Sequence, residues 1–159
     1  MVKKQMVSKR KIFPLYRIHS LNLAKQNLWI NKCFPQFIFH EEEQHWVGKL
    51  ISSYQKQSYT VKIVYNRGNP KVFITHPGIL RKCPHMYTDN SLCLYYPPDK
   101  SYKVDKIIAK TIIPWTCEWL YYYEVWYETG VWWGPEAPHR INSARGKKIT
   151  RKMMRGIGN

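Results

Sequence analysis

The segment from Cys83 to Leu94 carries the residues of this chain whose types and spacing could do chemistry. A run of four turn-forming residues, 88–91, leads to Cys93, which stands between two leucines, and His85 lies eight positions before it. A cysteine thiolate is a strong nucleophile, and an imidazole can exchange a proton near neutral pH. A lone cysteine is more commonly a small buried hydrophobic residue, but a place in a polar loop favours a catalytic role for Cys93.

The first half of the chain predicts one helix followed by a meander of strands. Apolar residues recur at intervals of three and four between Pro14 and Ile30, which indicates an amphipathic helix that ends before Pro35. Its predicted apolar stripe consists of Leu15, Ile18, Leu21, Ala24 and Leu28. After Pro35 the period changes to two, which predicts strands at 37–40, 46–53, 59–65 and 72–75, with a turn at 66–70. One face of the third strand would carry Tyr59, Val61, Ile63 and Tyr65.

The second half predicts a long loop and a second helix. No regular pattern appears between Thr75 and Lys103, whereas most loops have about four to six residues, and long loops in compact domains are commonly functional. A helix is expected from near Thr116, after Pro114, to Gly130. We expect its apolar stripe to pack against the sheet as core, and this stripe consists of Trp119, Leu120, Tyr123, Trp126 and Tyr127.

Length and composition predict one globular domain with basic ends. The 159 residues, 44% of them hydrophobic, suffice for one core but not for two ordinary domains. The formal net charge of +16 is concentrated in segments 1–13 and 140–159, which flank an expected domain at 14–139. No apolar run approaches the roughly 20 residues of a membrane span, and no apolar signal core follows the basic start. A cytoplasmic protein without membrane contact is therefore expected.

Metal and nucleic-acid sites are not the favoured interpretation of the composition. The cysteines lack the paired spacing of structural zinc sites, since the nearest approach is Cys83-x-His85 with Cys93 well downstream, so free thiols are expected. Cys33 and Cys117 lie on predicted helices and are expected in the core. A basic nucleic-acid-binding module stays as a lesser alternative, because the chain has no RNA-binding aromatic signature, helix-turn-helix pattern or zinc finger. No glycine-rich phosphate loop occurs, and no cofactor is expected.

Element order and local motifs together resemble one known family. The strand before the long loop reads PKVFIT over residues 70–75, Cys83-Pro84-His85 follows, and NSLCL occupies residues 90–94. Over about residues 15–130 these features resemble the ubiquitin-conjugating enzymes, in which a His-Pro-Asn tripeptide precedes the cysteine at the same spacing. The resemblance implies an α+β protein with the ubiquitin-conjugating-enzyme fold: an N-terminal helix, a four-stranded antiparallel meander, a long active-site loop and a C-terminal helix. Two departures are Cys83 in place of the family's His and His85 in place of its Asn.

The C-terminal half resembles a narrower group of this family. Its motifs are Leu92–Tyr95, Ile113–Leu120, Tyr123–Trp126 and Thr129–Gly134, followed by His139. These are similar to the prokaryotic ubiquitin-conjugating-like proteins of short type II CBASS antiphage operons, where such a protein stands beside a cGAS-like nucleotidyltransferase. The resemblance implies a thioester transferase loaded with the C-terminus of that nucleotidyltransferase, or of a ubiquitin-like protein, which passes the acyl group to an amine such as an acceptor lysine.

The resemblance also implies roles for particular residues. Cys93 would be the nucleophile and thioester carrier. His85 would donate a hydrogen bond to the oxyanion, act as general base toward the amine, or only brace the loop through a backbone hydrogen bond. Asp99 would orient or desolvate the incoming amine, unless it is an ordinary loop residue, and the segment 132–134 with His139 would form a structural lid. The missing Asn keeps open the alternative of a catalytically inactive adaptor that only scaffolds a partner.

Overall fold

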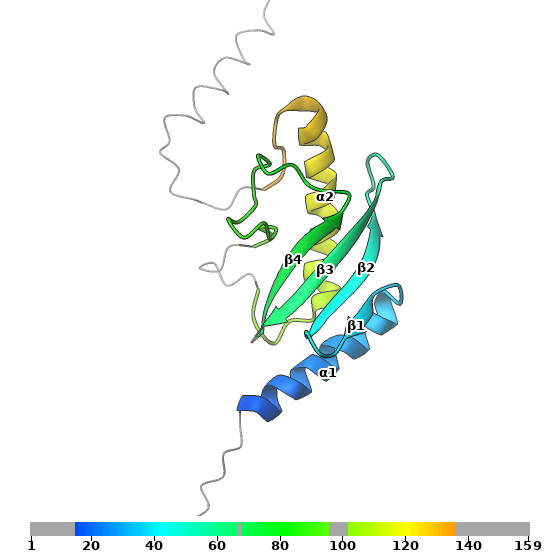
Figure 1. Cartoon of the computed structure of the whole chain (residues 1–159), viewed down its shortest axis with the longest axis vertical. Helices are drawn as coiled ribbons and strands as arrows, with labels where there is room; N and C mark the ends of the chain where they lie inside the picture. Colours follow the sequence, from blue (N-terminus) through cyan, green and yellow to red (C-terminus); the bar gives the residue numbers. More distant parts are fainter. Residues whose placement is uncertain (1–14, 67, 96–101, 136–159) are drawn as a thin grey trace, which may run out of the picture.

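One helix precedes, and another follows, a four-stranded antiparallel sheet (Figure 1). The computed structural model describes residues 15–66, 68–95 and 102–135. The elements are α1 (Leu15–Cys33), β1 (Ile38–His40), β2 (His45–Ile51), β3 (Ser58–Asn66), β4 (Asn69–His76), a short 3₁₀ helix η2 (Ile108–Lys110) and α2 (Ile112–Thr129). The strands follow the order β1-β2-β3-β4, so the predicted α+β class and meander are confirmed. The expected basic ends, 1–13 and 140–159, lie outside the described residues.

Helix α1 ends before Pro35 as predicted, but two residues of the predicted stripe are not buried, and the burial of Leu15, Ile18 and Leu21 lies outside what the structure describes. Ala24 is exposed and Leu28 is 68% exposed, whereas Gln26 and Ile30 are fully buried. Cys33, the last residue of the helix, is also exposed and not part of the core. The period of the apolar residues predicted burial of Ala24 and Leu28 wrongly, because polar contacts with distant segments decide which side of α1 faces the core.

Two side-chain amides of α1 make these polar contacts. The Gln26 amide nitrogen donates to the backbone oxygen of Lys106 at 2.7 Å, and its oxygen accepts from the Ile108 backbone N–H at 2.8 Å. At the next residue, the side-chain oxygen of Asn27 accepts from the indole N–H of Trp46 on β2 at 2.9 Å. A buried amide is tolerated when its donor and acceptor are both used. Gln26 therefore fixes α1 against η2, and Asn27 fixes it against the sheet.

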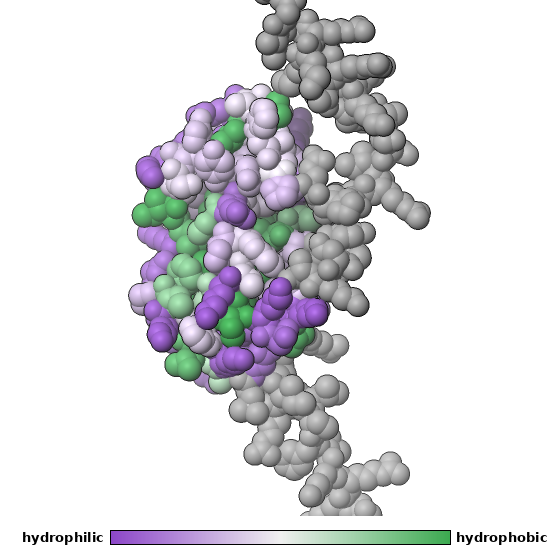
Figure 2. All heavy atoms as spheres, turned by 180° about the vertical axis from the view of Figure 1, so that it is seen from behind, coloured by the Kyte–Doolittle hydropathy of each residue, from purple (hydrophilic) through white to green (hydrophobic). Residues whose placement is uncertain are grey.

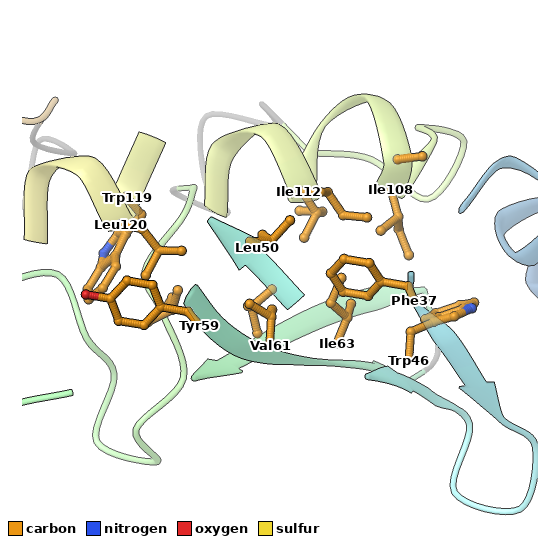
Figure 3. Close-up of a cluster of buried hydrophobic side chains, with 14 of the residues drawn as sticks. Phe37, Trp46, Leu50, Tyr59, Val61, Ile63, Ile108, Ile112, Trp119 and Leu120 are labelled. Atoms are coloured by element: carbon orange, nitrogen blue, oxygen red, sulfur yellow. The ribbon is translucent and has the colours of Figure 1, made fainter. Parts of the chain in front are cut away.

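The core lies between one face of the sheet and α2 with η2 (Figure 3). Strand β3 buries the face that its period of two predicted, which consists of Tyr59, Val61, Ile63 and Tyr65. On β2, Gly48 lies against the ring of Phe37, and a Cβ at this position would come within 2.4 Å of that ring. Only glycine therefore allows Phe37 to reach the sheet surface.

A buried carboxylate joins the end of β2 to α2. Strand β2 ends at Ile51, two residues earlier than predicted, and the Ser52 hydroxyl donates to Glu124, which is 1% exposed. The same carboxylate accepts from the Gln55 backbone N–H at 2.9 Å and from the Tyr59 hydroxyl at 3.0 Å. Three donors satisfy this buried charge, as a buried carboxylate requires.

Helix α2 starts earlier than the sequence predicted. It begins at Ile112 and not near Thr116, because Pro114 falls in the first turn, where a backbone N–H has no partner within the helix. It ends before Gly130, as predicted, and this glycine adopts a left-handed φ of 71°. Tyr127, expected in the buried stripe, is 61% exposed. The stripe prediction holds for Trp119, Leu120 and Tyr123, which are buried, and Trp126 is partly buried against the core.

Large apolar side chains are also exposed on several elements. Figure 2 shows hydrophobic residues in green among polar residues in purple on the face opposite to that of Figure 1. Exposed apolar residues in isolation are normal in folded proteins. Within the described ranges, no helix combines the length and apolar character that crossing a membrane requires. The most exposed of these side chains are Leu28, Ile38, Ile51, Tyr127 and Trp133.

Candidate active site

The candidate cysteine lies in a loop that is hydrogen-bonded to the edge strand β4. The Leu92 backbone N–H donates to the Val72 oxygen at 2.8 Å, and Leu92 forms an antiparallel bridge with Met86. Leu92 is 4% exposed, so its side chain belongs to the core. The residue that follows it, Cys93, is partly exposed. The buried leucine therefore fixes the backbone from which the thiol projects.

A tight turn precedes the cysteine, as the sequence predicted. The Tyr87 backbone N–H donates to the Ser91 oxygen at 2.9 Å, and the Asn90 N–H donates to the Tyr87 oxygen at 3.0 Å. Asn90 has a φ of 65°, a left-handed conformation that asparagine tolerates well. The Asp89 carboxylate accepts from the Ser91 backbone N–H at 3.0 Å and from its hydroxyl at 2.6 Å. Local side-chain hydrogen bonds therefore close this turn.

An ion pair joins the turn to the sheet. The Lys71 ammonium on β4 lies 2.6 Å from the Asp89 carboxylate. The hydrogen bond from Lys71, and then those from Ser91, lower the pKa of Asp89 to about 2. Both side chains are well exposed, so the pair stabilises the fold by less than about 1 kcal/mol. Its main effect is to fix the position of the turn on β4.

The backbone of His85 braces the cysteine. Its carbonyl oxygen accepts from the Cys93 backbone N–H at 2.9 Å and from the indole N–H of Trp119 on α2 at 3.1 Å. His85 itself has a φ of 60°. The bracing role that the sequence left open is thus performed by the backbone carbonyl. The structure brings His85 and Cys93 together, as their spacing suggested, and ties both to α2.

The His85 ring packs under the segment that follows α2. Its centroid lies 4.7 Å from the ring of Trp132, which also contacts Trp119 at 5.6 Å and Tyr122 at 6.0 Å. Gly134 is buried, and a Cβ there would lie 2.8 Å from Trp132 Nε1. Trp132 therefore packs on the loop through His85, whereas Trp133 is 65% exposed, so only part of the expected lid contacts the loop. His139, the other part of the expected lid, lies outside the described residues.

Sequence reasoning missed Tyr87 as a neighbour of the candidate nucleophile. Burial first, and then a hydrogen bond with Cys93, raise the pKa of the Tyr87 phenol above its ordinary value. The phenol also donates to the Tyr95 backbone oxygen at 3.3 Å. The turn signal at 88–91 could have revealed this contact, because a tight turn brings together the residues on its two sides. At neutral pH the phenol keeps its proton and can donate it in a hydrogen bond.

The other thiols are in different environments. Burial raises the pKa of Cys83 to about 12, and its thiol lies 3.2 Å from the Pro84 oxygen, so it stays protonated. Burial also raises the pKa of Cys117, which is half-buried on α2. Cys33 is exposed, but it ends α1 and has no place in the loop. Cys93 therefore combines partial exposure with a braced backbone and a polar neighbour.

The third predicted site residue cannot be placed. Asp99 lies outside the described residues. Around Cys93, the described part of the chain contains no group of side chains spaced to hold a metal ion. The geometry thus assembles a thiol, a phenol and a tryptophan-packed imidazole at the edge of β4.

Comparison with known proteins gives one family. The model of the family described as Type II CBASS E2 protein matches residues 26–140. This range includes the whole sheet, the loop with Cys93 and helix α2. No curated protein matches the chain.

Proposed function

This chain belongs to the family of Type II CBASS E2 proteins, and from that premise we propose that Cys93 is the thioester site of a ubiquitin-conjugating-type transferase. Its donor would be the C-terminus of a cGAS-like nucleotidyltransferase or of a ubiquitin-like protein. Its acceptor would be an amine, such as a lysine of another protein. The observation that carries the proposal is the position of Cys93, partly exposed and with its backbone N–H held by His85.

The reaction has two acyl transfers at Cys93. In the first, the thiolate sulfur attacks the carbonyl carbon of an activated C-terminus; a C–S bond forms and the activating group leaves. In the second, an amine nitrogen attacks the thioester carbon; a C–N bond forms, the C–S bond breaks, and the amine loses a proton as the thiolate departs. If activation of the carboxyl group uses ATP, it would come from another protein, because this sequence offers no nucleotide-binding signature.

Two neighbours of Cys93 would assist these steps. The Tyr87 phenol, whose one hydrogen is donated to the Tyr95 backbone oxygen at 3.3 Å, would rotate it toward the Cys93 sulfur to assist these steps. The His85 imidazole, packed against Trp132, would donate a hydrogen bond to the oxyanion where the family has an Asn amide. Removal of one such donor costs about 10²–10³ in rate in other enzymes.

The proposal is tested by co-expression of the full chain with its operon neighbours. Intact mass and non-reducing gels would be recorded for wild type, Cys93→Ala and, as a matched control, Cys33→Ala, which removes another exposed thiol. We expect an adduct cleaved by hydroxylamine in wild type and Cys33→Ala, and none in Cys93→Ala. Hydroxylamine cleaves a thioester but leaves a disulfide intact, so it separates the two linkages.

Two results would contradict the proposal. An adduct that persists in Cys93→Ala would place the linkage elsewhere. A stable complex without any adduct in wild type would support the alternative of an inactive adaptor. The role of His85 is tested separately: His85→Asn should conjugate faster than His85→Ala if the side chain acts as oxyanion donor, whereas a general base would be lost equally in both variants.

A further inference from the structure

A second group of reactive side chains lies at the opposite edge of the sheet from the cysteine loop. Strand β1 forms that edge, and β4 forms the other (Figure 1). His40 ends β1, His45 begins β2, and the two face each other in the strand register. Glu43 lies in the turn between them. One ligand atom from each of these three residues lies within 4.8 Å of those of the other two.

The buried member of this group has an unsatisfied nitrogen. His45 is 8% exposed, and its Nδ1 makes no hydrogen bond within the described part of the chain. The rings of His40 and His45 stack with centroids 4.8 Å apart and planes 16° from parallel. Buried polar atoms are nearly always paired, since leaving one unpaired costs about 1–3 kcal/mol. A coordinated cation would give this nitrogen its partner.

The charge distribution around the hairpin also favours a cation. The turn contains Glu41, Glu42 and Glu43, which are three of the ten acidic residues in a chain with a net charge of +16. Carboxylates so close to two imidazoles supply negative charge that attracts a cation.

We propose that His40, Glu43 and His45 bind a divalent transition-metal ion, with zinc as the natural occupant. Two imidazoles and a carboxylate suit zinc, which takes three protein ligands and leaves a fourth position to water. Zinc bonds of about 2.0–2.2 Å place tetrahedral ligand atoms roughly 3.5 Å apart. The three ligand atoms would therefore close by about 1 Å, which rotation of the exposed His40 and Glu43 side chains permits.

A metal ion bound at this site would stabilise the pairing of the edge strand β1 with β2. Strand β1 has three residues and pairs with β2 only, so few hydrogen bonds hold it. An ion bound by His40 and His45 would link the two strands at the turn. Because a ligand that binds only the folded state stabilises it, zinc should raise the melting temperature.

The test is a calorimetric titration of zinc chloride into the full chain, free of any affinity tag and stripped with a chelator. We expect wild type to bind one more equivalent of zinc than His40→Gln, or to bind that equivalent at least about tenfold more tightly. His76→Gln, which removes another exposed histidine, is the matched control and should bind like wild type. Zinc held by thiols is common to all variants and cancels in the comparison. His40 is exposed, so its variant should fold.

A second pair of variants separates a site from general attraction to acidic residues. Glu43→Gln should lose the same equivalent as His40→Gln, whereas Glu42→Gln should keep it. Zinc, and not magnesium, should raise the melting temperature of wild type, and the rise should vanish in His40→Gln. Equal binding by wild type and His40→Gln, or equal loss in both glutamate variants, would overturn the proposal.

Discussion

Gly134→Ala should disturb the packing of Trp132 on His85 through a steric clash alone. The φ of this glycine is not in the left-handed region, so alanine can adopt the same backbone. Its Cβ would lie 2.8 Å from both Trp132 Nε1 and Tyr122 Cδ2, whereas ordinary contacts begin at 3.4 Å. The neighbours must retreat by about 0.6 Å. Since an indole is rigid, the whole Trp132 ring must shift relative to His85.

The expected magnitude follows from the cost of overpacking. An extra carbon in a packed site costs about 1–3 kcal/mol, and we expect about 2 kcal/mol for Gly134→Ala. For a chain of this length that loss lowers the melting temperature by about 4–8 °C. The matched control is Gly78→Ala, where nothing lies within 4 Å of the added Cβ. Gly78→Ala should be neutral or stabilising by about 0.4–1 kcal/mol, because alanine restricts the unfolded chain.

Two measurements check this reasoning. Urea unfolding followed by tryptophan fluorescence gives the free energy of unfolding for wild type, Gly134→Ala and Gly78→Ala. Proton NMR of the His85 ring, assigned with His85→Gln, reports the ring current of Trp132 directly. The reasoning is refuted if Gly134→Ala stays within about 0.5 kcal/mol of wild type and the His85 signals do not move.

Three further predictions concern the thiols, the turn and the buried carboxylate. At about pH 8, iodoacetamide should label Cys33 far faster than Cys83, because burial raises the pKa of the Cys83 thiol to about 12. Peptide mass spectrometry measures both labelling rates, and equal rates would contradict the burial of Cys83. Asp89 should titrate near 2 in an NMR titration of its carboxyl carbon. Its lowered pKa stabilises the fold above about pH 4, and this contribution disappears as the pH falls through about 2. A titration midpoint at the ordinary value of 3.8 would exclude the ion pair in solution. Glu124→Gln should lower the free energy of unfolding by about 1–3 kcal/mol, because a carboxylate that accepts from Ser52, Gln55 and Tyr59 would become an amide with a single acceptor oxygen. An unchanged urea midpoint would contradict this prediction.

Local sequence patterns predicted the elements of the sheet and the turn before the cysteine. The alternation of Tyr59 and Val61 in β3 identified the buried face, because side chains on a strand alternate between its two faces. The turn-forming residues 88–91 predicted a turn whose bonds are local, such as those of Asp89 to Ser91. Gly130 marked the end of α2 because glycine readily adopts a left-handed φ.

Helix faces and boundaries were predicted less well. Leu28 was expected inside and lies outside, while the polar Gln26 is fully buried. The hydrophobic period predicts that a leucine is buried in preference to an amide. It cannot show that the Gln26 amide finds a donor and an acceptor about 80 residues away, which makes its burial possible. Pro114 was interpreted as preceding α2, although the first helical turn accepts proline equally well.

The sequence by itself determined the candidate nucleophile, its distance along the chain from His85, and the order of helix, meander, loop and helix. These features depend on residue type, local backbone preference and short-range period, which any stretch of chain carries with it. Only the tertiary structure decided that Trp132 packs on His85 and that His45 is buried with an unpaired nitrogen. Such contacts depend on how the loop and the segment after α2 pack against the sheet, and on what each buried polar atom then finds beside it.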